Sequence, residues 1–293
     1  MFEVMTNTPF ITPTHLTPSP EEIQESKLSS QNIERALYAL HFDGLVVLEN
    51  VVDHVHLNIL NEAMAKDTEF LASLGEESPY NYHRGTSNGC LYNLQGISNR
   101  IHHRAETFSF AISSWVLRAF LYSSLTLNKD DIAIQITSTF LGPCPRMNFL
   151  SGNTALKSTE SQPVHTDADF AHPQIPFAVV VNVPLVTMTP ENGATEFWLG
   201  THTNSGLHIQ EDWRGDKAGG EIKNDIVEAR RKEFPPIQPV ISKGSIIIRD
   251  LRLWHCGKPN FEGTPRILLA MIHFASWYRN SMRFSTFQIL TLC

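Results

Sequence analysis

The sequence predicts a mainly β fold, a sandwich or barrel, flanked by a helical N-terminal region. After Asp131 the chain changes to short β-type runs separated by turn residues, at the spacing of such folds. Before that point, apolar residues recur at helical spacing behind recognisable helix starts. With 293 residues, the chain is long enough to bury the core of one elaborated domain.

We therefore divide the chain into an arm and one domain. Residues 1–20 include a stretch rich in Thr, Pro and Ser and are expected to form an irregular arm. The domain is expected to span residues 21–293, with a helical part over 21–125 and a β core over 130–280.

Helix signals come first in chain order. Ser19-Pro20-Glu21-Glu22 offers an N-cap, a proline at the first helical position and acids in the first turn, which predicts a helix to about Leu40. Asp43-Gly44 ends it, and residues 45–48 read as a short buried strand. Asp53 is expected to cap the next helix. Residues 78–96 then predict a polar loop that covers a site, and residues 105–122 another helix.

The β core is predicted from runs of β-type residues. A two-residue hairpin is expected at Asn192-Gly193, because this dipeptide readily adopts positive φ angles. The charged piece 228–233 reads as a solvated helix face. The expected strands are 132–140, 145–150, 177–186, 194–199, 245–249 and 267–277.

Composition excludes several classes of function. Against 30 Asp and Glu there are only 23 Lys and Arg, giving a formal charge of −7, and no basic run offers a patch for nucleic acid. The longest apolar stretches are too short to cross a membrane. Four cysteines without a C-x-x-C, and an N-terminus without signal features, favour a reducing, cytoplasmic location.

Histidines and acids supply a candidate metal site. In His165-Thr166-Asp167 the imidazole and the carboxylate project to the same side of an extended segment, where both can hold one ion. This pair is weak evidence alone. His255 is the best third ligand, because it closes the long strand-like segment 244–255. Arg266, eleven residues later, is expected to lie on the same sheet face as His255.

Other residues compete for these roles. Asp169 and Asp250 are alternative carboxylates, although Asp169 is four residues from His165 and Asp250 lies inside a strand segment. His172, His202 and His273 are alternative imidazoles; His202 reads rather as a structural hydrogen-bonding residue and His273 as a core or pocket-lining one. Arg249 and Arg252 are expected to support the site through ion pairs, and Trp254 is expected to pack in the interior.

Taken together, these motifs resemble one known family over roughly residues 42–278. The order H-x-D, then a histidine 90 residues later, then an arginine eleven further is similar to the phytanoyl-CoA dioxygenase family of Fe(II)/2-oxoglutarate oxygenases. Gln162, three residues before His165, and the segments 191–195 and 249–255 agree with it. The resemblance implies a double-stranded β-helix, or cupin-like jelly roll, and is strongest to members that tailor secondary metabolites.

The resemblance also implies a chemistry. Fe(II) would be held by His165, Asp167 and His255, which leave open positions for 2-oxoglutarate and O₂. The co-substrate would be held by Arg266, Thr195 and Gln162; a planar guanidinium suits its distal carboxylate. Ascorbate would serve as reductant.

The implied reaction oxidises a small molecule, such as a secondary metabolite or an amino-acid derivative, by hydroxylation, desaturation or cyclisation, with release of succinate and CO₂. A homodimer is expected by analogy only. Two functions from other classes stay open: a non-catalytic metal-binding jelly-roll protein, and a metal-dependent hydrolase or isomerase with the same ligands. Arg266 discriminates among the three, since only a 2-oxo diacid requires it.

Overall fold

The structure is a computed structural model, described over residues 12–73, 88–90, 132–211, 220–279 and 290–291. Over these residues, eight strands form a large sheet in the order β1-β2-β7-β5-β9-β4-β10, with β3 also paired to β4, and β6 and β8 form a small sheet. The strands are β1 (Thr14–Leu16), β2 (Leu45–Leu48), β3 (Asn88–Cys90), β4 (Arg146–Ala155), β5 (Ala178–Pro184), β6 (Thr195–Phe197), β7 (Ile246–Asp250), β8 (His255–Gly257), β9 (Arg266–Phe274) and β10 (Leu290–Thr291).

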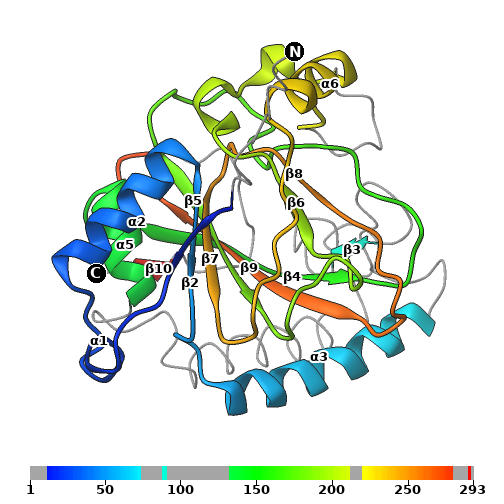
Figure 1. Cartoon of the computed structure of the whole chain (residues 1–293), viewed down its shortest axis with the longest axis horizontal. Coiled ribbons are helices and arrows are strands. Elements are labelled where there is room, and N and C mark those ends of the chain that lie inside the picture. Colours follow the sequence, from blue (N-terminus) through cyan, green and yellow to red (C-terminus); the bar gives the residue numbers. More distant parts are fainter. Residues whose placement is uncertain (1–11, 74–87, 91–131, 212–219, 280–289, 292–293) are drawn as a thin grey trace, which may run out of the picture.

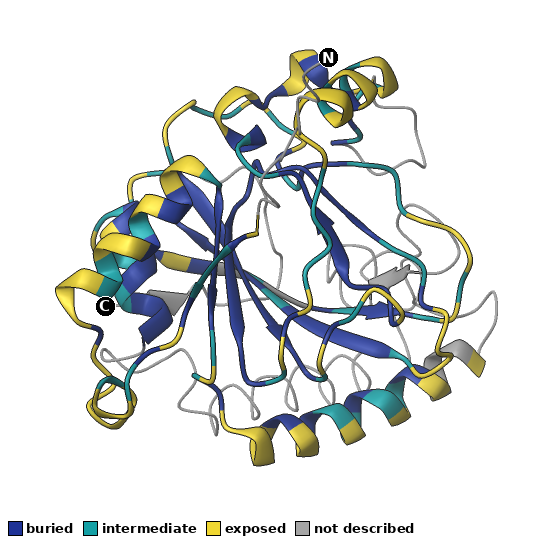
Figure 2. Cartoon of the chain, in the orientation of Figure 1, coloured by how far each residue is buried: buried dark blue, intermediate teal, exposed yellow. Residues whose placement is uncertain are grey.

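Helices cover one face of the large sheet, and the small sheet lies across the other (Figure 1). The strands are buried, whereas the helices turn an exposed side to solvent (Figure 2). The helices are α1 (Pro20–Gln24), α2 (Ser30–Phe42), α3 (His54–Ser73), α5 (Ile132–Leu141) and α6 (Asn224–Glu233), with 3-10 turns η3 (Thr201–Asn204) and η4 (Leu207–Ile209). Of these, α2, α3 and α5 pack on the large sheet.

Alternation along β9 separates the two faces of the large sheet. Because successive side chains of a strand point to opposite faces, Ile267, Leu269 and Met271 pack with the helices. Leu268 and Ile272 belong to clusters on the opposite side, which we call the inner face. Arg266, in step with the second set, therefore lies on the inner face, toward the small sheet.

The N-terminal region differs from the prediction in two details. Residues 14–16, within the expected irregular arm, form β1, which pairs parallel with β2. The predicted helix to Leu40 is two helices. A capping box between Ser19 and Glu22 starts α1 as expected, but the Glu22 carboxylate also accepts a hydrogen bond from the Ser29 N–H, at 2.6 Å, and Ser29 caps α2.

The prediction of a strand over residues 132–140 was wrong, because this segment is helix α5. Its Ile and Thr content favours strands, but its burial has helical spacing. Ala133, Ile136 and Phe140 are buried, whereas Gln135 and Thr139 lie on the outer side. Burial against α2 and the large sheet therefore outweighs the β-propensity of this sequence.

The predicted hairpin at Asn192-Gly193 is a turn between two different sheets. The Ala194 N–H donates to the Thr189 carbonyl at 2.9 Å, and Gly193 has φ +81° as the dipeptide suggests. However, β5 before the turn belongs to the large sheet and β6 after it to the small one. The position of the turn is as predicted, but Asn192 does not share the positive φ of Gly193, the closing hydrogen bond encloses residues 190–193, and the predicted pairing was wrong.

The segment 244–255 is likewise not one strand. It divides into β7 of the large sheet and β8 of the small sheet. At the break, Arg252 donates to both carboxylate oxygens of Asp250, at 2.7 and 2.8 Å, and to the Gln174 carbonyl. His255 and Arg266 therefore lie in opposite sheets, and the expectation that they share one sheet face was wrong.

Several other expectations have simpler outcomes. Asp53 accepts from the His56 N–H at the start of α3, and the charged piece 228–233 is an exposed part of α6, as predicted. The predicted loop 78–96, apart from β3, and the predicted helix 105–122 lie outside the described residues. Cys144 is disulfide-bonded, which the cysteine pattern did not predict. Among the described helices, none is long and apolar enough to cross a membrane.

Candidate metal centre

His165 and His255 are direct neighbours across an antiparallel bridge. Each backbone N–H donates to the carbonyl of the other residue at 2.9 Å, and the ring centroids are 4.2 Å apart. Both side chains are buried, with exposed fractions of 6% and 7%. Two residues that are 90 positions apart in the chain are thereby held as one pair.

The backbone also determines which ring nitrogen of each histidine faces the site. Nδ1 of His165 lies 2.9 Å from the Pro163 carbonyl, and Nδ1 of His255 lies 3.0 Å from the Leu253 carbonyl. A carbonyl can only accept, so Nδ1 carries the proton in both rings. In the neutral imidazole each Nε2 then keeps its lone pair, which is the form that binds a metal ion.

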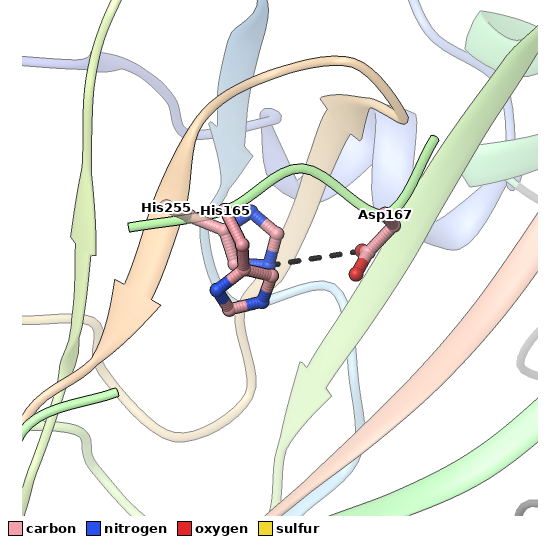
Figure 3. A group of neighbouring side chains, drawn as sticks. All are labelled: His165, Asp167 and His255. Carbon is pink, nitrogen blue, oxygen red and sulfur yellow. Dashed lines mark ion pairs between the residues drawn. The ribbon is translucent and has the colours of Figure 1, made fainter. Parts of the chain in front are cut away.

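Asp167 completes the group. In the part of the chain that the structure describes, His165, Asp167 and His255 are the one cluster whose ligand atoms lie close enough to hold an ion, all within 4.8 Å of one another. The three side chains point toward a common centre, and Oδ2 of Asp167 is 3.7 Å from Nε2 of His255 (Figure 3). The sequence motif thus becomes a spatial cluster.

The alternative ligands lie elsewhere or are otherwise engaged. Asp250 is ion-paired with Arg252, and Asp169 is exposed and outside the cluster. Nε2 of His202 lies 3.2 Å from the His41 carbonyl, so His202 has the structural role expected of it. His172 stacks on Phe177, and His273 faces Thr137 of α5, in the core.

Asp167 is ionised at neutral pH. Burial alone favours the neutral carboxyl, but the positive charge of Arg249, the charge that His255 and His165 carry when protonated, and the hydrogen bond from Arg249 outweigh burial and hold the pKa of Asp167 below its ordinary range. Nη2 of Arg249 lies 2.6 Å from Oδ2 of Asp167. The ion pair expected for Arg249 is therefore formed with a candidate metal ligand.

Arg266 is a buried cation without a carboxylate partner among the described residues. Its exposed fraction is 2%, and Nη2 donates to the Gly193 carbonyl at 2.6 Å. Nε and Nη1 are buried and have no hydrogen-bond partner. Burial lowers the pKa of Arg266 to about 10, so the guanidinium is still charged at neutral pH. An unpaired buried charge is costly, and an anion at this point would satisfy it.

Thr195 and Gln162 flank Gly257, two residues after His255. Thr195 of β6 pairs directly with Gly257, and so shares the inward side of the small sheet with His255. The side-chain oxygen of Gln162 accepts a hydrogen bond from the Gly257 N–H at 2.8 Å, and the backbone N–H of Gln162 donates to the Gly257 carbonyl. Both predicted residues therefore border the strand that carries His255.

Asn182 was missed by sequence reasoning. Its side-chain oxygen accepts from Nε of Arg249 at 3.2 Å, and its amide donates to the Leu269 carbonyl. A signal existed, since Asn182 is the one amide in the apolar run Ala178–Pro184. A buried polar residue in a central strand indicates a specific partner.

This arrangement suits an iron ion with exchangeable positions. Two imidazoles and one carboxylate form the set that holds non-haem Fe(II) on one side and leaves the other positions open. A model of one protein family, phytanoyl-CoA dioxygenase (PhyH), matches residues 40–267. The chain belongs to the phytanoyl-CoA dioxygenase family. It is therefore a non-haem iron, 2-oxoglutarate-dependent dioxygenase, as the sequence predicted.

Solved structures agree with the predicted fold. The chain resembles the epimerase SnoN, solved with Fe³⁺, α-ketoglutarate and nogalamycin RO (18% identity, TM-score 0.56, 85% of each chain covered). It also resembles the α-ketoglutarate-dependent carbocyclase SnoK (15%, 0.54, covering 88% of this chain and 87% of that one). A third is EctD from S. alaskensis with 2-oxoglutarate and 5-hydroxyectoine (16%, 0.52, 89% and 83%). The mainly β jelly roll with a helical flank is thus confirmed, and over the described residues its large sheet is mixed and not closed.

Proposed function

We propose that this dioxygenase binds Fe(II) through His165, Asp167 and His255 and 2-oxoglutarate through Arg266, and that it oxidises a small molecule. The proposal rests on the burial of the Arg266 guanidinium and on its two nitrogens without hydrogen-bond partners. A guanidinium that is buried on the inner face, with two nitrogens unpaired, is a site for a carboxylate. When bound, the iron and co-substrate supply the oxidising power, with release of succinate and CO₂.

The two alternative functions explain less of the site. A metal-dependent hydrolase or isomerase, or a protein that binds a metal without catalysis, needs the three ligands. Neither needs an unpaired arginine buried between the sheets. In contrast, a 2-oxo diacid chelated at the metal presents a second carboxylate some distance away, for which Arg266 is suited. We assign Thr195 and Gln162 to the same co-substrate, because both border the strand that carries His255.

The inner face also favours one side for the substrate. Arg249 pairs with Val180, which pairs with Ile272, so the metal cluster lies part-way along β9 between Arg266 and Phe274. The end of the inner face near Phe274 is lined with apolar rings, among them the part-buried Phe149, Phe170 and Tyr278. If the co-substrate extends from the metal cluster toward Arg266, the space that remains for the substrate lies at the end lined with aromatic rings. We therefore propose a substrate with an apolar or aromatic portion.

The type of oxidation is proposed more broadly, as hydroxylation, desaturation or cyclisation. Proteins of this fold include an epimerase and a carbocyclase. The fold therefore does not select the outcome, which depends on which C–H bond the pocket presents to the iron. A screen of small metabolites with apolar portions, scored by substrate-triggered succinate release, would identify the substrate class.

The decisive experiment is anaerobic addition of Fe(II) and 2-oxoglutarate to the protein. We expect a visible charge-transfer band that requires both, followed by succinate formation when O₂ is admitted. Absence of both would overturn the proposal. A band without succinate under every substrate tested would favour the non-catalytic protein, and turnover of a substrate without consumption of 2-oxoglutarate would favour a hydrolase or isomerase.

A further inference from the structure

A chain of buried polar contacts runs from the centre of the large sheet to Asp167. The Leu269 carbonyl of β9 accepts from the Asn182 amide at 3.3 Å, and the Asn182 oxygen accepts from Nε of Arg249 at 3.2 Å. Nη2 of Arg249 then donates to Oδ2 of Asp167 at 2.6 Å. Three neighbouring strands, β9, β5 and β7, thus hold one oxygen of a candidate metal ligand.

Among the described residues, the Arg249 guanidinium forms an ion pair with the Asp167 carboxylate alone. Arg249 is 5% exposed and Asn182 is 3% exposed. Asp167 is the one acid that the described residues offer Arg249 as an ion-pair partner, and Nη1 of Arg249 is buried without a partner. If the role of Arg249 were only to stabilise the fold, an apolar side chain in its place would avoid burying a charge.

The hydrogen bond from Arg249 to Oδ2 of Asp167 affects how this carboxylate would bind a metal ion. A carboxylate can bind a metal ion through one oxygen or through both. The short hydrogen bond from a charged donor fixes the orientation of the carboxylate, and Oδ2 is also the oxygen that lies 3.7 Å from Nε2 of His255, so the contact favours binding of a metal ion through that one oxygen. Two histidines and a carboxylate binding through one oxygen take three positions; a carboxylate binding through both would take a fourth, which 2-oxoglutarate and O₂ require.

We propose that Arg249 is a positioning residue, oriented by Asn182, that keeps Asp167 a one-oxygen ligand and so keeps a coordination position open beside the chelated 2-oxoglutarate. The inference rests on the proposed function, because it presumes iron at the cluster. A guanidinium is required since its nitrogens must reach Asn182 and Asp167 at once, which the single nitrogen of a lysine does not reproduce.

Nitric oxide is a suitable probe, because it occupies an open position on Fe(II) and gives an electron paramagnetic resonance signal without turnover. We would add it anaerobically to the Fe(II) and 2-oxoglutarate complexes of the wild type and of Arg249→Met. The wild type is expected to give the nitrosyl signal. Arg249→Met is expected to retain the charge-transfer band but to bind nitric oxide roughly tenfold or more weakly, the size of effect typical for groups that orient metal ligands.

Two variants keep the test decisive. Arg249→Lys restores a charge near Asp167 and should recover part of the nitric oxide affinity, whereas Asn182→Leu, which leaves Arg249 in place but unanchored, should lose part of it. If Arg249→Met does not fold, these two variants decide the matter. Nitric oxide affinity equal to wild type in all folded variants would overturn the inference. Absence of the band in the wild type would instead overturn the proposed function.

Discussion

His165 and His255 exchange both of their backbone hydrogen bonds, each at 2.9 Å, although 90 residues separate them in the chain. This pairing joins the loop that carries Asp167 to strand β8 of the small sheet. The metal cluster is therefore part of the β scaffold and not an arrangement of mobile side chains. We expect the site to be formed before any metal binds, because strand pairing and the carbonyl partners of both rings do not depend on it.

The first prediction concerns the choice of carboxylate. Asp167→Ala should abolish Fe(II) binding while the fold survives, because it removes the anionic donor of the cluster. Asp169→Ala, two residues away at an exposed position, is the matched control and should bind iron as the wild type does. Metal content after dialysis against Fe(II), with circular dichroism as a check of folding, measures both. Iron retained by the Asp167 variant would show that another carboxylate is the ligand.

The second prediction concerns Arg266. Arg266→Met should weaken 2-oxoglutarate binding by roughly 10- to 150-fold, the loss expected for a hydrogen-bonded charge pair of about 1.5–3 kcal/mol. Arg266→Lys should lie between, since a lysine keeps the charge but not the fork. Titration of the charge-transfer band with 2-oxoglutarate measures the affinity, and iron content should not change. Equal affinities in all three proteins would mean that a different cation holds the co-substrate.

A companion measurement separates binding from folding at the same residue. Without ligands, Arg266→Met should be as stable as the wild type or more stable by about 1–4 kcal/mol, because an apolar side chain replaces a buried, partly unpaired charge. Urea unfolding of both apo proteins tests this. A large loss of stability in the variant would assign Arg266 a structural role.

The third prediction concerns the turn that supports Arg266. Gly193 has φ +81°, and a Cβ added there would lie 2.7 Å from the Lys258 carbonyl oxygen. The carbonyl of the same residue accepts the hydrogen bond from Arg266. Gly193→Ala should therefore lower the free energy of unfolding by about 1–3 kcal/mol, the range for a strained backbone position. It should also weaken 2-oxoglutarate binding. Gly142→Ala, at a positive φ with open space around it, is the control for the backbone effect without displacement of Arg266.

The fourth prediction concerns pH and stability. His273 is fully buried, and burial lowers its pKa to about 4, from the ordinary 6.5. Between these values the unfolded chain binds a proton that the folded protein does not, so the free energy of unfolding should fall as pH decreases, by at most about 1.4 kcal/mol per pH unit from this residue. Above pH 6.5 the contribution is constant.

His273→Leu isolates this effect, because leucine does not titrate. The difference in unfolding free energy between the variant and the wild type should shift in favour of the variant as pH falls from 6.5 to 4, and should be flat above that range. Denaturant unfolding at several pH values measures it. A difference independent of pH would show that His273 is protonated equally in both states.

Features that depend on neighbouring residues could be predicted from the sequence. The capping box at Ser19, the turn at Asn192-Gly193 and the H-x-D pair each depend on residues close together in the chain. The family motifs extended this to His255 and Arg266, whose spacing reflects the fold. In contrast, the local sequence wrongly predicts a strand at helix α5, because the type of this element depends on the helix and sheet that bury it and not on its own propensity.

By itself, the sequence determined which residues are suited to hold a metal ion and a diacid, because those properties belong to imidazole, carboxylate and guanidinium groups. Only the tertiary structure decided how they meet. The break between β7 and β8 places His255 in the small sheet, opposite Arg266 in the large one. The link from Asn182 through Arg249 to Asp167 likewise crosses strands that are distant in sequence. Such contacts follow from the register of β5, β7 and β9, which is set by burial across the whole sheet.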